Sequence, residues 1–273
     1  MNETLTKWAA CIVYYEGEEH LLALLASLEK QSLPPFKVFI ADNNSTKFPN
    51  LKDYSFPVQV CKAEKNLGFA GGANLSINAA ITNNFCNFIL FSQDVLLEIN
   101  SSEKLIEALQ SKKGLVFPTM WDRKNNTIFS KGGRINKFTG SIKLSKKLVP
   151  HKPDWADGSC LVFTKNLFNS IDGFSNKYFM YFEDVDFCYR AKVQGFSLTH
   201  VDTNVSQIPN GPNPFFRGRN SVVFARRTNS IVLKLTVTLR NFLGILFLLL
   251  KFRANDGLSR FKGVLQGWEI NID

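Results

Sequence analysis

The sequence predicts an α/β protein with a mostly parallel, doubly wound central sheet and helices on both faces of that sheet. Short β-rich runs alternate with helical patterns through the first half of the chain, an order typical of parallel strands joined by crossover helices. The chain has 273 residues and is 45% hydrophobic and 13% aromatic, so it can bury a large core. Polar clusters follow several predicted strands, and in such sheets ligands bind beyond the carboxyl ends of the strands.

The first half supplies four strands, each a run of apolar residues bounded by polar turn residues. These strands are residues 8–15, 36–41, 56–63 and 85–91. Two helices are predicted among them. Residues 17–31 are amphipathic with acids in the first turn, and residues 68–81 form a small-residue helix that opens with a glycine-rich turn.

The second half is less regular. After a strand at residues 113–118, residues 119–155 carry glycines among basic residues and indicate hairpins or a mobile loop. A strand at residues 157–163 and a short helix at residues 164–171 follow. A further helix is predicted to start near Glu183.

The cysteines and the N-terminal sequence both favour a reducing compartment. The chain has five cysteines, an odd number, and none forms a C-x-x-C pair, which argues against a disulfide framework and against a zinc site. The first 15 residues lack a basic stretch followed by an apolar run, the pattern of a signal peptide. We therefore expect a cytoplasmic protein.

The basic charge of the chain is concentrated near its C-terminus. The net charge is +10, and residues 217–263 contain ten basic residues and a single acid. Residues 231–253 are strongly apolar, although Lys234 and Arg240 interrupt them. The longest unbroken apolar run, residues 242–250, is shorter than the ~20 residues that span a bilayer. The run is therefore predicted to be too short to cross a membrane.

A basic helix with a broad apolar face suits the surface of an anionic membrane. We therefore expect one domain at residues 1–227 and an amphipathic, membrane-associating helical segment at residues 228–273. The alternative is a helix that packs on the domain or in a homodimer. Nucleic-acid binding would also use the basic charge, but the apolar run beside the charges fits lipid better, so no nucleic-acid partner is expected.

Three polar motifs follow predicted strands: "ADNNST" (41–46), "NLGFAGGAN" (66–74) and "FSQDV" (91–95). The glycine-rich motif matches neither a dinucleotide fingerprint nor a P-loop, but its glycines allow close backbone approach and the helix after it favours anions. Asp94, at a strand end, is suited to hold Mg²⁺ or Mn²⁺ against a diphosphate. Taken singly, each motif is explained at least as well as a turn or a helix cap.

The segment "KYFMYFEDVDFCYR" (177–190) places Glu183, Asp184 and Asp186 among aromatic residues. A metal site, a catalytic base and an acidic helix start are all open for this cluster. An EF-hand is excluded, because no glycine-centred loop with a closing Glu is present. An apolar wall raises the pKa of a carboxylate, as a general base needs, whereas a helix N-terminus stabilises the charged form. If the helix starts near Glu183, then Glu183 and Asp186 share a face and Asp184 points elsewhere.

These motifs, with "DGSC" (157–160), "DGFSNKYFMYFEDVDFCYRA" (172–191) and "RGRN" (217–220), resemble family 2 glycosyltransferases in their order along the chain. The similarity covers roughly residues 8–227 and is greatest to the bacterial rhamnosyltransferase-like branch, which builds surface polysaccharides. The resemblance implies a GT-A fold, a nucleotide-diphosphate sugar donor, transfer with inversion, and a divalent metal, Mg²⁺ or Mn²⁺.

The resemblance also implies roles for single residues. Asp184 would be the catalytic base, with Glu183 beside it, and Asp94 would hold the metal. Ser92 stands where many relatives have Asp or Asn, so metal ligation would rest on Asp94 alone. Asp42 would contact the base of the donor. The acceptor side would include Asp157, Gly158 and Tyr181. The nucleotide-sugar pocket would be lined by Asp42, Asn44, Asn66, Gly68, Phe69, Gly72, Asn74, Gln93 and Arg219.

The expected function is therefore inverting transfer of a sugar, with dTDP-rhamnose as the first choice of donor, to a lipid-linked or growing surface polysaccharide of the O-antigen or capsule type. The protein would act at the inner face of the plasma membrane. A UDP-hexose or UDP-HexNAc donor is the nearest alternative, and a catalytically degenerate protein that binds glycans or scaffolds an assembly is another. A nucleotidyltransferase would carry a basic glycine-rich loop after the first strand, whereas "YYEGEEH" (14–20) is acidic there.

Overall fold

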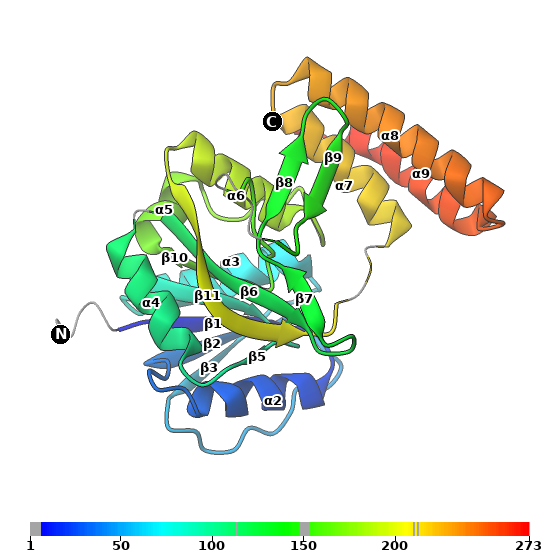
Figure 1. The fold of residues 1–273 in the computed structure, drawn as a ribbon. Coiled ribbons are helices and arrows are strands. Elements are labelled where there is room, and N and C mark those ends of the chain that lie inside the picture. Colours follow the sequence, from blue (N-terminus) through cyan, green and yellow to red (C-terminus); the bar gives the residue numbers. More distant parts are fainter. Residues whose placement is uncertain (1–6, 113, 148–152, 210, 212, 273) are drawn as a thin grey trace.

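The computed structural model describes residues 7–112, 114–147, 153–209, 211 and 213–272. It shows a twisted central sheet covered by helices on both faces and a group of helices beside it that includes the C-terminus (Figure 1). The predicted α/β class is confirmed.

The main sheet has nine strands in the described chain, in the order β3-β2-β1-β4-β10-β6-β11-β5, with β7 paired to β6. Its strands are β1 (Ala9–Tyr14), β2 (Lys37–Asp42), β3 (Val58–Lys62), β4 (Asn87–Ser92), β5 (Leu96–Leu97), β6 (Gly114–Asp122), β7 (Thr127–Ser130), β10 (Cys160–Thr164) and β11 (Ser197–Gln207). Strands β1 to β4 pair in parallel, as do β6 and β11. Strand β10 runs antiparallel to both β4 and β6, so the second half of the sheet is mixed.

Helices cover both faces of the sheet because successive residues of each buried strand point to opposite sides. In β1, Ala9, Cys11 and Val13 join the core on one side, whereas Ala10 and Ile12 join the core on the other. The helices on the first side are α3 (Gly68–Thr82), α5 (Lys165–Ser170) and α6 (Glu183–Val193). The helices on the second side are α2 (Glu18–Glu29) and α4 (Ser101–Ser111).

A hairpin of β8 (Gly133–Asn136) and β9 (Ser141–Leu144) rises from the sheet, which confirms hairpins in the described part of residues 119–155. Residues 148–152 of that predicted region lie outside the described residues. The hairpin reaches the C-terminal helices, where Thr236 donates from its hydroxyl to the carbonyl oxygen of Lys137 at 2.7 Å.

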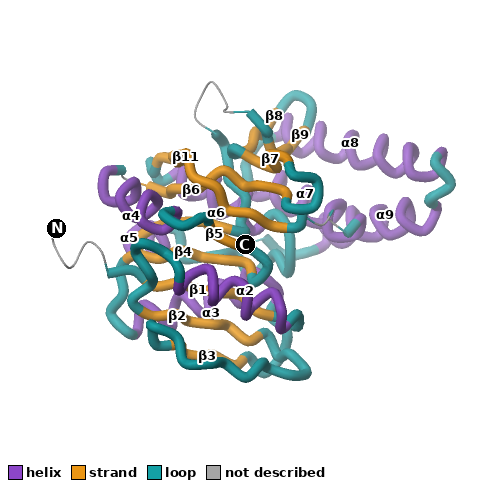
Figure 2. The backbone as a smooth tube through the Cα atoms, turned by 60° about the horizontal axis from the view of Figure 1, so that its bottom comes forward, coloured by secondary structure: helices purple, strands orange, loops and turns teal. Residues whose placement is uncertain are grey.

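Three helices follow the sheet: α7 (Pro214–Arg227), α8 (Ile231–Leu250) and α9 (Ala254–Glu269). Helix α9 returns along α8 and packs closely on α7, and α8 and α9 project away from the sheet (Figure 2). Small residues allow this approach, since a Cβ on Gly267 would lie 2.5 Å from the carbonyl oxygen of Arg219 and one on Gly263 would collide with that of Phe215. The contacts between α7 and α9 therefore cross the predicted boundary at residues 227 and 228, and the division into two domains stays a prediction.

Helix α8 is long and apolar enough, by length and composition alone, to cross a membrane. The expectation that this segment is too short to span is therefore wrong by that criterion, because the 20-residue helix extends beyond the unbroken apolar run and tolerates Lys234 and Arg240. Leu233 and Val237 anchor the helix in the core, and most of its other apolar side chains are exposed.

Candidate active site

The carboxyl ends of β1, β2 and β4 lie at one edge of the sheet, and the polar motifs after them are tied together there. Asn43, after β2, donates from Nδ2 to the carbonyl oxygen of Gly68 at the start of α3, at 2.9 Å. Gln93, after β4, accepts from the backbone N–H of Tyr15 at 2.7 Å and donates to the carbonyl oxygen of Glu16. The structure thus brings together the three motifs that the sequence places at strand ends.

Asp42 and Asn44 form the turn at the end of β2. Asp42 is buried, and its Oδ1 accepts from the backbone N–H of Ser45 at 3.0 Å and from its hydroxyl at 2.6 Å. Asn44 has φ 62°, a left-handed conformation that Asn adopts more readily than most residues. The contact between Asp42 and a donor base stays a prediction, with one carboxylate oxygen already used by the turn.

The start of α3 abuts the segment that precedes α6. Asn66 Oδ1 accepts from the backbone N–H of Gly68 at 2.9 Å, and the N–H of Phe69 donates to the carbonyl oxygen of Phe179 at 2.7 Å. Gly68 has φ 72°, and a Cβ there would collide with the carbonyl group of Phe179. Glycine is therefore required at residue 68, where the glycine-rich motif joins the edge at the carboxyl ends of β1, β2 and β4 to the segment before α6.

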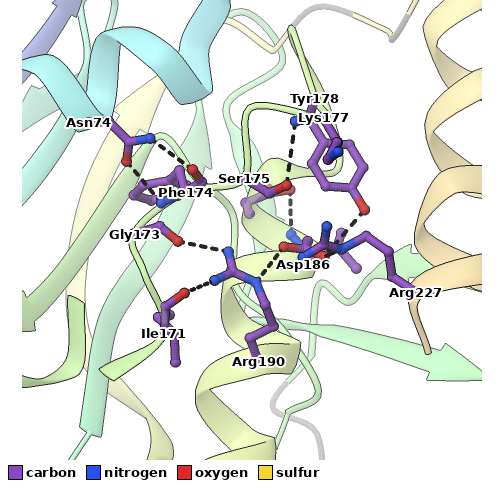
Figure 3. A network of polar contacts seen from close by, with 12 residues as sticks. Asn74, Ile171, Gly173, Phe174, Ser175, Lys177, Tyr178, Asp186, Arg190 and Arg227 are labelled. Atoms are coloured by element: carbon purple, nitrogen blue, oxygen red, sulfur yellow. Dashed lines mark hydrogen bonds and ion pairs between the residues drawn. The ribbon is translucent and has the colours of Figure 1, made fainter. Parts of the chain in front are cut away.

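Gly72 and Asn74 make packing and structural contacts. A Cβ on Gly72 would lie 2.7 Å from a methyl group of Val13. Asn74 Oδ1 accepts from the N–H of Phe174 at 2.9 Å, and its Nδ2 donates to the carbonyl oxygen of Phe174 at 2.8 Å (Figure 3). Both residues are predicted to line the nucleotide-sugar pocket, but a ligand contact by the Asn74 amide would have to break these hydrogen bonds.

Four carboxylates gather where the ends of β4, β10 and α6 meet: Asp94, Asp157, Glu183 and Asp184. Asp157, just before β10, lies close enough to Glu183 and Asp184 to raise the pKa of both. Burial raises the pKa of Asp157, and the charge of Asp94 raises it further. None of the four takes part in an ion pair among the described residues. Asp157, Glu183 and Asp184 therefore retain protons to higher pH than isolated carboxylates do.

Asp184 is held at the first turn of α6 by two backbone N–H groups. Its Oδ2 accepts from Gly158 at 3.0 Å, and its Oδ1 accepts from Val185 at 2.8 Å. A Cβ on Gly158 would lie 3.0 Å from the Asp184 Cβ, so a larger residue would push the carboxylate away. Burial, followed by the charge of Asp157, raises the pKa of Asp184 to about 7, against the lowering effect of these N–H groups.

Glu183 is buried beside Asp184, and its Oε2 has no hydrogen-bond partner within the described chain. Burial and then the charge of Asp184 hold the pKa of Glu183 well above its usual range. A buried carboxyl without a partner is costly unless it is protonated. Glu183 therefore keeps its proton to higher pH than an exposed Glu does, and in the protonated form it can donate a hydrogen bond.

Asp94 is the predicted metal ligand. Its Oδ1 accepts from the hydroxyl of Ser92 at 2.7 Å, so the serine that replaces the family acid orients the remaining carboxylate. The described residues contain no group of three or more His, Cys, Asp or Glu side chains placed to hold a metal ion. A metal here would be held by Asp94 and the phosphate oxygens of a donor, an arrangement that Mg²⁺ accepts, since proteins usually bind it with one or two carboxylates and substrate phosphates. The residues present fit such an ion.

Asp186 has a structural role. Its Oδ1 accepts from Arg227 Nε at 2.9 Å and from the Tyr178 hydroxyl at 3.3 Å, and its Oδ2 accepts from Arg190 Nε at 2.6 Å (Figure 3). Arg190 in turn donates to the carbonyl oxygens of Ile171 and Gly173. Helix α6 starts at Glu183, as expected, so Asp186 faces this network while Asp184 faces Gly158.

Arg219 and Asn220 hold the loop before α6 in place. Arg219 Nη1 donates to the carbonyl oxygen of Lys177 at 2.9 Å, and Asn220 Nδ2 donates to those of Met180 and Tyr181 at 2.7 and 2.8 Å. Tyr181 has φ 68°, and the residue after it is also left-handed, a strained turn that these bonds stabilise. A donor contact by Arg219 stays a prediction, and its guanidinium group already donates to Gln266, Lys177 and Asn220.

Two further residues contribute at this edge without being predicted. Asn43 ties the first two motifs together, and Arg123 donates from Nη2 to the carbonyl oxygen of Asp94 at 2.9 Å. Asn43 lies inside the motif "ADNNST", so the position of this motif at a strand end could have indicated it. Arg123 lies in the irregular region after β6, where nothing in the sequence marks it.

A family model described as "Glycosyl transferase family 2" matches residues 9–186, from β1 to the acidic start of α6. The chain belongs to glycosyl transferase family 2. The match includes all four clustered carboxylates and the strands β1, β2 and β4, which confirms the resemblance seen in the sequence.

Curated relatives of this family 2 chain are distant. It is 24% identical over 215 residues to the low-salt glycan biosynthesis hexosyltransferase Agl10 of Haloferax volcanii, covering 74% of this chain and 66% of the relative. It is 26% identical over 221 residues to N-acetylglucosaminyl-diphospho-decaprenol L-rhamnosyltransferase of Mycobacterium tuberculosis, covering 69% and 71%. It is 23% identical over 218 residues to rhamnosyltransferase WbbL of Escherichia coli, covering 70% and 78%. The matched region thus spans about two thirds to three quarters of these relatives.

Solved structures share the fold of this family 2 chain. A crystal structure of GalNAc-T7 with UDP, GalNAc and Mn²⁺ has a TM-score of 0.61 at 15% identity and covers 81% of this chain and 47% of that one. A crystal structure of S. aureus TarS in complex with UDP has a TM-score of 0.58 at 14% identity and covers 86% and 72%. The fold is therefore GT-A-like.

Proposed function

We propose that the chain is an inverting glycosyltransferase that uses Asp184 as its catalytic base. The observation that carries this proposal is the position of Asp184 in a family 2 fold. Asp184 is a carboxylate with a pKa of about 7 that lies near the carboxyl ends of the sheet strands, where the donor motifs are. A base with a pKa near neutral is half ionised under working conditions and accepts a proton efficiently. The cluster around Asp184 supplies the electrostatic environment that such a base needs.

In the proposed reaction, Asp184 accepts the proton of an acceptor hydroxyl. The oxygen of that hydroxyl forms a bond to the anomeric carbon of the donor, and the bond between this carbon and the nucleotide diphosphate breaks. Burial and the charge of Asp184 raise the pKa of Glu183, which favours its protonated form and so limits negative charge beside the attacking oxygen. A divalent ion held by Asp94 would neutralise the charge of the departing diphosphate.

The donor is proposed to be dTDP-rhamnose, and the acceptor a lipid-linked or growing surface glycan. The names of two relatives support rhamnose, and one of them also names a diphospho-decaprenol acceptor. A UDP-hexose or UDP-HexNAc is the alternative donor, because one relative is a hexosyltransferase and a related fold has been crystallised with UDP-GlcNAc. The acidic cluster fits either donor.

Calorimetric titration with dTDP-rhamnose, UDP-glucose and UDP-GlcNAc tests both the donor and the metal. We expect one of them, dTDP-rhamnose first, to bind tightly with Mn²⁺ and at least about tenfold more weakly with EDTA. Asp94→Asn should bind the donor in Mn²⁺ as weakly as the wild type does in EDTA, because it removes the carboxylate that would hold the ion.

Two results of this titration would contradict the proposal. If Asp94→Asn keeps the full effect of Mn²⁺, then Asp94 does not hold the metal. If none of the three nucleotide sugars binds in either condition, the chain is not the proposed transferase, and the glycan-binding scaffold becomes the better account. The replacement of the family acid by Ser92 is the observation that favours that second candidate.

We also propose that α8 and α9 dock on an anionic membrane surface. Helix α8 exposes a continuous set of large apolar side chains, and monomeric proteins rarely expose a patch of this kind without a partner. The exposed residues include Leu235, Leu239, Phe242, Leu243, Leu246 and Phe247. Basic residues lie on and beside the same helix and would face lipid phosphates. They include Lys234, Arg240, Lys251 and Arg253.

Three arginines from the three C-terminal helices add to this charge. Arg260 of α9 donates from Nε to Asn241 at 3.0 Å, and Arg217 and Arg240 lie close by on α7 and α8. Burial, and then the charges of those two arginines, lower the pKa of Arg260 to about 10. No ion pair is formed by these three within the described chain, so an anion such as a lipid phosphate would relieve their repulsion.

Exchanging Phe242, Leu246 and Phe247 together for Ser should weaken binding to vesicles of phosphatidylcholine and phosphatidylglycerol at least about tenfold, since each large apolar side chain contributes about 1.5–3 kcal/mol when buried. Co-sedimentation measures this binding. The matched control exchanges Phe36 and Ile99, equally exposed but remote from α8, and should bind as the wild type does.

Unchanged vesicle binding by the triple variant would refute the membrane proposal. So would a wild type that binds neither anionic nor neutral vesicles and elutes as a dimer, because a second copy of the chain would then cover the apolar face.

A further inference from the structure

One hollow in the described surface lies outside the predicted site residues. It has a volume of about 640 Å³ and is formed by β5, the end of β6, the turn after it and β11. Both polar and apolar side chains line it. Its lining includes Leu97, Glu98, Trp121, Arg123, Asn126 and Asn204.

The hollow is joined to the candidate active site through Arg123. Arg123 Nη2 donates to the carbonyl oxygen of Asp94 at 2.9 Å, so the hollow begins directly beside the predicted metal ligand. The other terminal nitrogen, Nη1, is buried and has no hydrogen-bond partner within the described chain. A buried guanidinium nitrogen without an acceptor is costly, and a ligand oxygen would satisfy it.

The remaining lining is ordered by its own hydrogen bonds. Trp121 Nε1 donates to Asn126 Oδ1 at 3.3 Å, which fixes the indole at the wall of the hollow. Asn204 Nδ2, on β11, donates to Glu98 Oε1, just after β5, at 2.9 Å. An aromatic ring face set among amide, carboxylate and guanidinium groups matches a saccharide, which presents apolar C–H faces and a rim of hydroxyl groups.

We propose that this hollow is a saccharide subsite that binds the acceptor glycan at a sugar unit away from the reacting hydroxyl, with Trp121 under one ring face and Arg123 on its oxygens. The position within the sheet favours the acceptor over the donor. The donor motifs follow β1, β2 and β4, whereas the hollow lies on β6, β11 and β5 at the other end of the strand order. Acceptor binding at this place rests on the proposed glycosyl transfer.

Saturation-transfer NMR with two probes, chitobiose and a rhamnose disaccharide, tests the subsite without requiring turnover. We expect the wild type to bind at least one probe. Trp121→Ala and Arg123→Gln should each weaken that binding at least about tenfold, and Trp121→Phe should restore most of it because an aromatic face remains. Phe36→Ala, an exposed aromatic residue at the amino end of β2, is the matched control and should bind as the wild type does.

The nucleotide-sugar titration with Trp121→Ala and Trp121→Phe gives the second readout, because Arg123 is hydrogen-bonded to Asp94 and its replacement would also disturb the predicted metal ligand. Unchanged donor affinity together with weakened disaccharide binding supports an acceptor subsite. The subsite is refuted if the wild type binds neither disaccharide, if the Trp121→Ala and Arg123→Gln variants bind the disaccharide as the wild type does, or if Trp121→Ala loses donor affinity equally. If disaccharides bind as expected but no donor does, the proposed transfer fails while the saccharide subsite stands.

Discussion

Replacing Asp184 by Asn should slow sugar transfer by about 10²–10⁴-fold, the usual contribution of a general base. The affinity for the nucleotide sugar should change little, because Asp184 faces Gly158 and Val185 rather than the donor motifs. Asn is close to Asp in shape and can still accept a hydrogen bond from one of these N–H groups. Transfer measured by nucleotide release, alongside donor titration, separates the two effects.

The activity of the wild type should depend on pH through the same residue. Asp184 must be ionised to accept a proton, and its pKa is about 7, so kcat/KM should rise as the pH increases through about 7 and level off above it. Asp184→Asn should lose this step in the profile.

The stability of the fold should change with pH in the opposite sense. The pKa of Asp184 is higher in the folded protein than in the unfolded chain, where Asp titrates near its ordinary value. Between these two pKa values the folded state holds the extra proton, so the free energy of unfolding falls as the pH rises through this window. Removing the charge should therefore make Asp184→Asn more resistant to heat than the wild type at pH 8.

The matched control is Asp202→Asn, whose side chain is 91% exposed at a distance from the cluster. It should leave transfer, its pH profile and the melting temperature unchanged. Full activity of Asp184→Asn would show that another group removes the acceptor proton, and a lower melting temperature would show that the carboxylate stabilises the fold.

Replacing Asp186 by Ala should lower the free energy of unfolding by about 3–5 kcal/mol, the usual cost of breaking a buried ion pair by removing one partner. The side chain of Asp186 is 1% exposed and pairs with both Arg190 and Arg227. The change leaves two guanidinium groups without their carboxylate and frees the loop that Arg190 holds at Ile171 and Gly173. Urea unfolding followed by circular dichroism measures the loss.

The contrast for this prediction is Arg253→Gln, which breaks the pair of Arg253 and Asp256 at the surface. Exposed pairs contribute at most about 1 kcal/mol, so this variant should unfold nearly as the wild type does. If Asp186→Ala lowered the free energy of unfolding as little as Arg253→Gln does, the network around Asp186 would not stabilise the segment at residues 177–190.

The sequence was sufficient to predict the secondary structure of the N-terminal part of the fold, from β1 to β4. Alternating apolar runs and helical patterns predicted the first four strands and the helices α2 and α3 with small errors at their ends. The antiparallel insertion of β10 was not predictable, because a short apolar run carries no information on direction or on its neighbours. From the sequence alone, the strand that begins at residue 160 could equally have run parallel to its neighbours.

The site shows a similar limit. Residue order identified the carboxylates that meet at the strand ends, and Asp184 and Asp94 lie in one cluster. The sequence did not separate residues that face a ligand from residues that hold a loop. Asn74 bonds to Phe174, and Asp186 belongs to an arginine network. The role of Asn74 depends on Phe174, 100 positions away, and the role of Asp186 depends on Arg227, on another helix. Local sequence patterns do not contain such contacts.

For the C-terminal segment, residues 228–273, composition alone predicted only part of the structure. Its apolar and basic residues predicted an amphipathic segment, and α8 exposes such a face. The glycines of α9 were not singled out, yet Gly263 and Gly267 allow the helix to lie directly against α7. Their role became visible only once both helices were placed.

The most direct test of the account is mass spectrometry of the glycosylated acceptor. Wild type and Asp184→Asn are each incubated with Mn²⁺, a GlcNAc-diphospho-lipid acceptor and whichever nucleotide sugar binds in the titration. If Asp184 is the catalytic base, we expect a product one sugar heavier with the wild type and almost none with Asp184→Asn, although both bind the donor. Equal product from the two proteins, or no product from a wild type that binds donor and acceptor, would contradict it.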